Sequence, residues 1–235
     1  MGLLRNLDSN EIVGQVLAVQ QWIRENKPKF AENDNQSQIT NIVFMGMGEP
    51  LDNLNSVLKS TSIFCDGQAF NLSHHKVTVS TVGVLDKIQE FLRQSPVSLA
   101  FSLHSPFDVE RTRMIPTNTT NPLEKLIDTL KNALNNGLRK SFLIQYTLIR
   151  GVNDSVEHAM ALSRLLAGYS FKVNLIPLNE HTGAAFRRPD LCSVYDFQQT
   201  LKQNGLVATI RLSKGRDVSG ACGQLIQNNK DNKIE

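Results

Sequence analysis

The sequence has few cysteines and few aromatic residues. Its 235 residues include three cysteines, Cys65, Cys192 and Cys222. Because they are odd in number and far apart, they do not indicate a disulfide framework, and each is either a buried apolar residue or a reactive thiol. One Trp and three Tyr do not suggest a surface that binds nucleic acid through aromatic stacking.

Long apolar runs are missing as well. No stretch reaches the roughly 18 to 20 apolar residues that a membrane span requires, and the polar residues Arg5 to Asp8 interrupt any signal-peptide pattern near the N-terminus. A hydrophobic content of 40% with 20% charged residues is typical of a soluble globular protein. We therefore expect a cytoplasmic protein with no membrane partner.

Neither sign of charge dominates, since 25 basic and 22 acidic side chains leave a net charge of +3. Affinity for nucleic acid depends on local basic clusters more than on totals. Basic residues recur in the predicted loops: Arg111, Arg113, Arg139, Lys140, Arg187, Arg188, Arg211, Lys214 and Arg216. If several share a face they form a phosphate-binding surface suited to RNA, whereas a solvated rim explains any single pair.

What the sequence does contain is a regular alternation of helix and strand. Asp8 and Glu11 resemble a capping box at the start of a helix that continues to about Asn26. Short apolar runs predict strands at 41–45, 76–80, 97–102, 141–148, 171–176 and 207–212. Amphipathic segments between them predict helices at 54–64, 85–92, 123–134, 156–167 and 193–203.

This alternation predicts a parallel sheet, because each parallel pair of strands needs a crossover helix. The units are too few for an eight-stranded barrel, which leaves an incomplete barrel or a doubly wound sheet. Polar residues stand at or just past the ends of several strands: Glu49, Ser80, His104 and Asn179. Ligands of parallel α/β folds bind at that edge.

Each of these residues has a structural reading beside the functional one. Gly46 and Gly48 let the backbone approach a ligand beside the Glu49 carboxylate, or they form a simple turn. His104 can orient a ligand or serve as a hydrogen-bonded structural histidine. Asn179 suits an adenine edge or a turn. Cys222, between Ala221 and Gly223, is either an accessible thiol or a small buried residue.

Taken together, several segments resemble one family, the radical S-adenosylmethionine methyltransferases that modify adenine C2 of 23S rRNA and tRNA, with their RlmN-like and Cfr-like members. The matching segments run in order along nearly the whole chain: 5–7, 45–51, 77–81, 102–104, 113–116, 146–154, 174–179 and 221–225. The resemblance implies a partial TIM-type barrel of parallel strands alternating with helices, in which the first strand and the cluster loop are missing. It places this barrel in residues 1–220 and a segment with the methyl-carrier cysteine in residues 221–235.

The same resemblance implies roles for individual residues. Gly48 and Glu49 correspond to contacts of the amino end of S-adenosylmethionine, and Ser80, Ser102, Leu103, His104 and Asn179 to its other contacts. Cys222 corresponds to the cysteine that is methylated and then carries the methyl group. In that chemistry a second S-adenosylmethionine yields a deoxyadenosyl radical, which activates the thiol-bound methyl for addition to the adenine ring. RNA and an electron donor such as flavodoxin are the implied partners.

One departure from the family changes the expected activity. The family holds a [4Fe–4S] cluster with a Cys-x-x-x-Cys-x-x-Cys loop, and this spacing does not occur here. We therefore expect no metal ligands in this chain, and we expect that it cannot reduce S-adenosylmethionine alone, as a truncated product or a fragment. One alternative is a non-catalytic remnant that binds S-adenosylmethionine or RNA. Another is a cluster-free barrel enzyme with Glu49 and His104 as its catalytic pair.

Overall fold

The computed structural model describes residues 3–26, 38–180 and 186–211, and within them all six predicted strands are present. The strands are β1 (Ile42–Phe44), β2 (Val77–Thr81), β3 (Ser98–Ser102), β4 (Phe142–Leu148), β5 (Phe171–Pro177) and β6 (Val207–Ile210). They are ordered β1-β2-β3-β4-β5-β6, and the pairs β1–β2, β3–β4, β4–β5 and β5–β6 are parallel. The sheet is not closed, since β1 and β6 are its two edges. This confirms the partial barrel of parallel strands.

Helices connect the strands as expected. The α-helices are α1 (Ser9–Glu25), α3 (Leu54–Cys65), α4 (Leu85–Gln94), α5 (Asp108–Met114), α6 (Leu123–Asn135), α7 (Val156–Leu166) and α8 (Leu191–Gln203). Short 3-10 helices are η2 (Pro50–Asn53), η3 (His74–Lys76) and η4 (Pro116–Thr119). The sequence predicted every α-helix except α5. None of the described helices is both long and apolar enough to cross a membrane.

The chain divides into two compact units, which we describe separately. Unit 1 comprises 1–44 and 48–99, and unit 2 comprises 45–47 and 100–235. The division falls within β3, so unit 1 holds β1 and β2, and unit 2 holds β4 to β6. The predicted boundary between residues 220 and 221 lies outside the described residues and stays a prediction.

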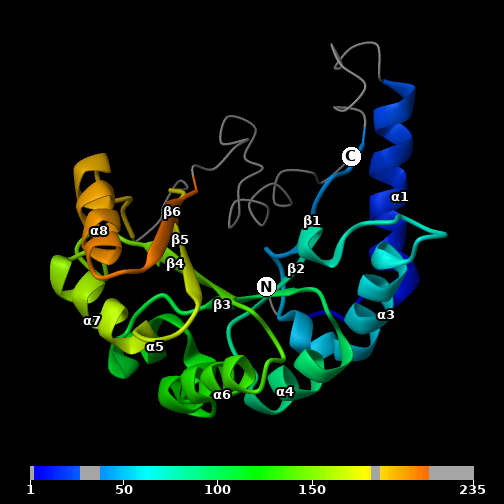
Figure 1. Cartoon of the computed structure of the whole chain (residues 1–235). Coiled ribbons are helices and arrows are strands. Elements are labelled where there is room, and N and C mark those ends of the chain that lie inside the picture. The colour runs from blue at the N-terminus through cyan, green and yellow to red at the C-terminus, as the bar shows by residue number, and fades with distance from the viewer. Residues whose placement is uncertain (1–2, 27–37, 181–185, 212–235) are drawn as a thin grey trace. The chain divides into compact units, whose positions relative to one another are not determined.

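In unit 1, helices pack against the short strands β1 and β2 (Figure 1). Asp8 caps α1 by accepting hydrogen bonds from the amides of Asn10 and Glu11, and the Glu11 side chain completes the predicted capping box. α1 packs along α3. Buried apolar side chains form the core of this unit: Leu51, Val57, Phe64, Val77, Val79, Ile88 and Phe91.

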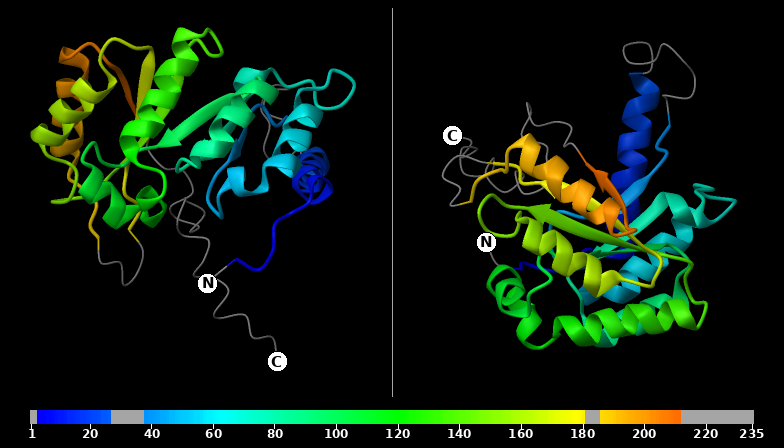
Figure 2. Two further views of the ribbon diagram at one scale, coloured as in Figure 1. Left: turned by 90° about the horizontal axis from the view of Figure 1, so that it is seen from below. Right: turned by 60° about the vertical axis from the view of Figure 1, so that its left-hand side comes forward.

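In unit 2, the long strands β4 and β5 pair over seven residues each. Their inward side chains are fully buried, as expected for strands covered by crossover helices. α7 and α8 run side by side over these strands (Figure 2). The core includes Leu130, Ile144, Tyr146, Leu162, Val173, Leu175 and Phe197.

Candidate functional site

The turn after β1 is shaped by two glycines with left-handed backbone conformations. Gly46 has φ +106° and Gly48 has φ +72°, a region that is costly for residues with a Cβ atom. Among the described residues, a Cβ added at either glycine would meet nothing within 4 Å. The turn therefore presents bare backbone beside open space, which is the arrangement that a ligand approaching the main chain needs.

Glu49 follows this turn and has a structural role of its own. It caps η2, with its Oε1 accepting from the Leu51 amide at 3.0 Å, while its Oε2 accepts from the Val82 amide at 2.9 Å. The carboxylate thus ties the turn after β1 to the turn after β2. Burial raises the pKa of Glu49 above its usual value, although its hydrogen bonds oppose the shift. The Thr81 side chain also hydrogen-bonds to this carboxylate, which leaves one of the four lone pairs of its oxygens for a bond from an amine.

Ser80 lies near the carboxyl end of β2 and is 8% exposed. The neighbouring Thr81 is buried, and its hydroxyl accepts a hydrogen bond from the Gly83 amide at 3.0 Å. Ser80 and Glu49 therefore belong to the same end of unit 1, the end at which its parallel strands finish.

Ser102 is the last residue of β3 and Leu103 follows it in unit 2, and both are buried. The Ser102 hydroxyl donates to Oε1 of Gln145 at 3.3 Å, and the Leu103 amide donates to the Gln145 carbonyl at 3.0 Å. The Leu103 side chain is fully buried in the core. The carboxyl end of β3 is thus held against β4.

His104 adopts a left-handed conformation with φ +61°, which is uncommon for a residue other than glycine. Its Nδ1 accepts a hydrogen bond from the Thr147 amide at 3.0 Å. A neutral ring with an accepting Nδ1 carries its proton on Nε2. Burial first, and the positive charge of Arg111 second, lower the pKa of His104 to about 4. His104 is therefore neutral near pH 7 and has one N–H to donate.

Two buried polar side chains hold this turn, and the sequence analysis assigned neither of them to the site. Arg111, which is fully buried, donates from Nε to the Leu103 carbonyl at 3.1 Å and from Nη2 to the Ser102 carbonyl at 3.2 Å. Asn153, also fully buried, donates to the His104 carbonyl at 2.6 Å. The sequence offered one signal, since a polar residue inside a buried segment needs hydrogen-bond partners.

Asn179 lies two residues past the end of β5 and is partly buried. The preceding residue, Leu178, donates its amide to the Leu148 carbonyl at 3.0 Å, which joins the ends of β4 and β5. Asn179 therefore also stands at the carboxyl ends of parallel strands. Cys222 lies outside the described residues.

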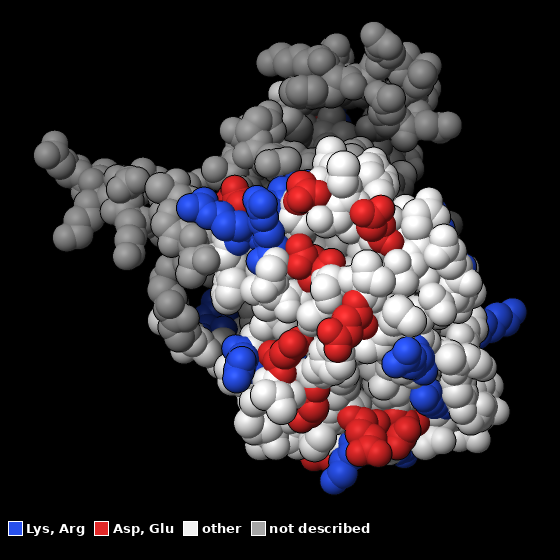
Figure 3. Space-filling model, turned by 90° about the vertical axis from the view of Figure 1, so that its left-hand side faces the viewer, with Lys and Arg blue, Asp and Glu red and all other residues white. Residues whose placement is uncertain are grey.

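The predicted basic residues do not all lie at the surface. Arg111, one of the residues considered for a phosphate-binding face, does not contribute to one, because its guanidinium is buried and donates to the Leu103 carbonyl. Arg139 is partly buried, which lowers its pKa. On the face shown in Figure 3 acidic groups are scattered, and Lys and Arg lie at its upper left margin and also along its right and lower margins. Lys214 and Arg216 lie outside the described residues.

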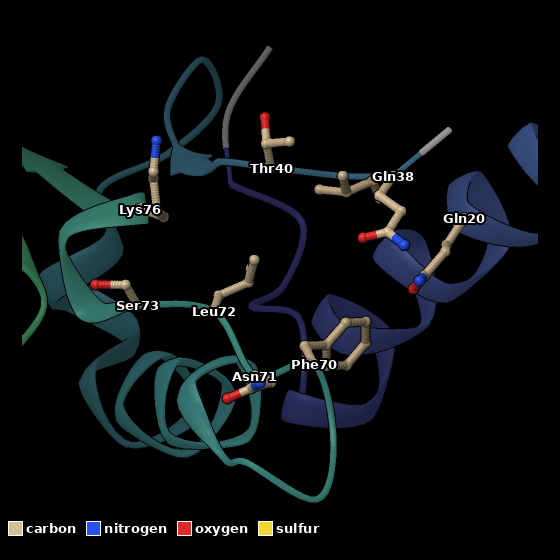
Figure 4. A pocket seen from close by; sticks show the side chains of 9 residues that line it. Gln20, Gln38, Thr40, Phe70, Asn71, Leu72, Ser73 and Lys76 are labelled. Atoms are coloured by element: carbon tan, nitrogen blue, oxygen red, sulfur yellow. The ribbon is translucent and has the colours of Figure 1, made fainter. Parts of the chain in front are cut away.

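A cavity of about 450 Å³ opens in unit 1, away from all of these residues. It lies where the chain enters β1 and β2, and Figure 4 shows Gln20 and Gln38 on one side of it and Ser73 and Lys76 on the other. Parallel α/β folds bind ligands at the opposite ends of their strands. None of the predicted site residues lines this cavity.

The predicted residues thus form two groups that have one property in common. Gly48, Glu49 and Ser80 belong to unit 1, whereas Ser102 to His104 and Asn179 belong to unit 2. In both units they stand at or just past the carboxyl ends of parallel strands. In each group, some residues already make hydrogen bonds that hold the loops of their own unit together.

Comparison with known proteins points to one superfamily. Residues 23–162 match the model of the radical SAM superfamily. The chain is 41% identical over 98% of its length to a protein of Halorhodospira halophila named dual-specificity RNA methyltransferase RlmN, and 42% identical over 99% to the one of Campylobacter concisus. It spans 61% and 59% of the lengths of these two relatives. The crystal structure of a radical SAM methyltransferase from Sphaerobacter thermophilus superposes with a TM-score of 0.87 at 39% identity, over 95% of this chain and 63% of that one.

Proposed function

This chain belongs to the radical SAM superfamily, and on that premise we propose that it binds S-adenosylmethionine as part of an RNA methyltransferase. The observation that carries the proposal is the position of the residues that the family resemblance assigns to this ligand. All of them stand at or just past the carboxyl ends of β1, β2, β3 and β5, where α/β folds of this kind bind their ligands.

The residues present fit such a ligand. In unit 1, the space beside Gly48 leaves backbone groups accessible to its amino acid end, and the remaining lone pair of Glu49 suits its ammonium group. In unit 2, His104 offers its Nε2–H, and the Asn179 amide can pair with an adenine edge or a carboxylate. When bound, S-adenosylmethionine supplies the methyl group.

The acceptor in this proposal is C2 of an adenine in 23S rRNA or tRNA. We propose that Cys222 carries the methyl group on its sulfur, and that residues 221–235 bring it to the barrel formed by residues 1–220. A thiolate is a strong nucleophile toward a sulfonium methyl group. We further propose that the protein acts in the cytoplasm, where RNA of this kind is found.

The described residues do not fit a [4Fe–4S] cluster. Such a cluster takes thiolate ligands close together, whereas Cys65 and Cys192 are free and lie on α3 of unit 1 and α8 of unit 2. No three His, Cys, Asp or Glu side chains of the described residues gather where they could hold a metal ion. We therefore propose that this chain alone performs no reductive step and accepts no electron from a flavodoxin-type donor.

The missing ligand spacing supports a second candidate function, a non-catalytic protein that binds S-adenosylmethionine or RNA. Both candidates include binding of S-adenosylmethionine, and they differ in whether the chain takes part in methyl transfer. A third reading, with Glu49 and His104 as an acid–base pair, has less support, because backbone amides already engage both Glu49 oxygens and Nδ1 of His104.

Two measurements on the 235-residue chain test these proposals. Calorimetric titration with S-adenosylmethionine should show binding at one site, and Glu49→Gln should weaken it. An iron assay after anaerobic reconstitution should give no stoichiometric cluster. Absence of binding would refute the methyltransferase proposal and leave only the RNA-binding form of the second candidate, and four iron atoms per chain would refute the proposed inactivity.

A further inference from the structure

A buried cation stands behind the end of β3. Arg111 is fully buried on α5, and its guanidinium carbon lies 5.1 Å from the ring centre of Phe101. Its Nε and Nη2 donate to the carbonyl oxygens of Leu103 and Ser102, and its Nη1 donates to Oδ1 of Asn118. One guanidinium group therefore donates hydrogen bonds to two successive carbonyl groups.

The next carbonyl in the chain is held as well. Asn153, from the loop after β4, donates to the His104 carbonyl at 2.6 Å. Three carbonyl groups in a row, those of Ser102, Leu103 and His104, thus accept bonds from buried side chains. Two of these donors come from one guanidinium, whose planar geometry fixes direction as well as distance. A strand end held in this way cannot change its backbone dihedral angles without breaking several bonds.

Side chains of α5 fix the orientation of Asn118, a residue of η4 that accepts a hydrogen bond from Arg111. The Asn118 amide donates to Oδ1 of Asp108 at 2.9 Å and to the Thr112 hydroxyl at 2.8 Å. Oδ1 of Asp108 also accepts from the Leu123 amide at 3.2 Å, at the start of α6. Asn118 therefore presents its oxygen to Arg111 in one fixed orientation.

Burial of a cation is unfavourable, because the charge loses its hydration, and well-made hydrogen bonds have to compensate for that loss. An apolar side chain would fill the same space against Phe101 at less cost. What it could not do is hold the carbonyls of Ser102 and Leu103 together and keep His104 in its left-handed conformation. Burial first, and the charge of Arg111 second, lower the pKa of His104 and so favour its neutral ring.

We propose that Arg111 is a positioning residue, which fixes the turn from Ser102 to His104 so that His104 presents its Nε2–H to S-adenosylmethionine. This inference rests on the proposed function and adds to it a residue that touches no ligand. Arg111 acts through the backbone of Ser102 and Leu103. The hydrogen bond from the Thr147 amide to His104 shows whether the His104 ring keeps its position.

The decisive variant is Arg111→Lys, which keeps a positive charge but loses the planar guanidinium that donates to two carbonyl groups at once. Arg113→Lys, the same change at an exposed position of α5, is the matched control. Two quantities are measured on the full chain: the hydrogen-exchange rate of the Thr147 amide by NMR, and the dissociation constant for S-adenosylmethionine by calorimetry. Both are measured at a temperature at which all variants are folded, so that a general loss of stability does not alter the affinity.

For Arg111→Lys we expect faster exchange at Thr147 and an affinity about tenfold weaker, the size expected for the loss of a charged hydrogen bond. The control should match the wild type in both measurements. If Arg111→Lys does not fold, Asn118→Ser replaces it, because this change removes only the side-chain amide that orients Arg111. It should also speed exchange at Thr147 and weaken the affinity for S-adenosylmethionine.

Unchanged affinity in a folded Arg111→Lys protein overturns the inference, even if exchange at Thr147 becomes faster. Equal changes in Arg113→Lys also overturn it. A wild-type chain that does not bind S-adenosylmethionine refutes the proposed function itself, which is a different result from wild-type binding that the variant retains in full.

Discussion

The side-chain amide of Asn153 donates to the carbonyl oxygen of His104 at 2.6 Å, so that the loop after β4 holds the turn after β3. The same amide donates to the Thr147 carbonyl at 2.7 Å, and Oδ1 of Asn153 accepts from the Ile149 amide at 2.7 Å. The Tyr146 hydroxyl donates to the Asn153 carbonyl at 2.9 Å. A single buried asparagine therefore joins two loops of unit 2.

We predict that Asn153→Ala destabilises the chain by about 3 kcal/mol, because two carbonyl groups and one amide are left buried without a partner. Urea denaturation followed by circular dichroism measures this change. Asn132→Ala, at an exposed position of α6, is the control and should change the free energy of unfolding by less than about 0.5 kcal/mol. Similar values for both variants would show that the Asn153 bonds contribute little.

A second prediction concerns the pH dependence that His104 confers. Its pKa of about 4 lies below the usual 6.5, so below pH 6.5 the unfolded chain binds a proton that the folded chain does not. The His104 contribution to stability is therefore present above pH 6.5 and is lost as the pH falls toward 4. Protonation of Nδ1 would also remove the acceptor of the Thr147 amide.

Urea denaturation between pH 7.5 and 4.5 tests this prediction. His104→Gln should lose less stability over that range than the wild type, whereas His75→Gln, a change of an exposed histidine, should follow the wild type. Parallel curves for the wild type and His104→Gln would contradict a depressed pKa.

Glu49 should give a pH dependence of the opposite sign. Burial raises its pKa above the usual 4.5 in the folded chain, so the folded state holds its proton to a higher pH than the unfolded state does. Its contribution is complete below pH 4.5 and is lost as the pH rises through the raised pKa. The free energy of unfolding of the wild type, relative to that of Glu49→Gln, should thus fall as the pH rises from 4.5. Glu124→Gln, at an exposed position of α6, should show no such trend.

Much of this fold could be predicted because its signals are local. The Asp8 and Glu11 capping box is a sequence pattern, and it lies where expected. Apolar runs marked the six strands to within a few residues. The polar residues at the strand ends followed from the rule that parallel strands finish at one edge.

The parts that could not be predicted depend on contacts between distant residues. The helix α5 is only seven residues long and its N-cap residue, Phe107, provides no side-chain hydrogen bond, so no local pattern marks it. Arg111 looked like a surface cation because its partners, the carbonyls of Ser102 and Leu103, carry no side-chain signature. The left-handed conformation of His104 depends on those same contacts. The roles assigned to Cys222 and to the ligand contacts stay predictions.

The last prediction concerns the edge strand β1. Of the described strands, β1 has β2 as its single neighbour, and Val43 at its centre is 49% exposed and pairs in register with Thr78. An edge that presents unpaired backbone groups and an apolar side chain is a template for association with another chain. We therefore expect the 235-residue chain to self-associate at micromolar concentrations, which sedimentation velocity detects.

Val43→Lys should shift the chain toward the monomer, because a charge on an edge strand opposes pairing. Val156→Lys adds the same charge at a site of α7 that is 54% exposed and away from any sheet edge. An equal shift in both variants would mean that net charge, and not the edge of β1, controls association, and a monomeric wild type would remove the premise altogether.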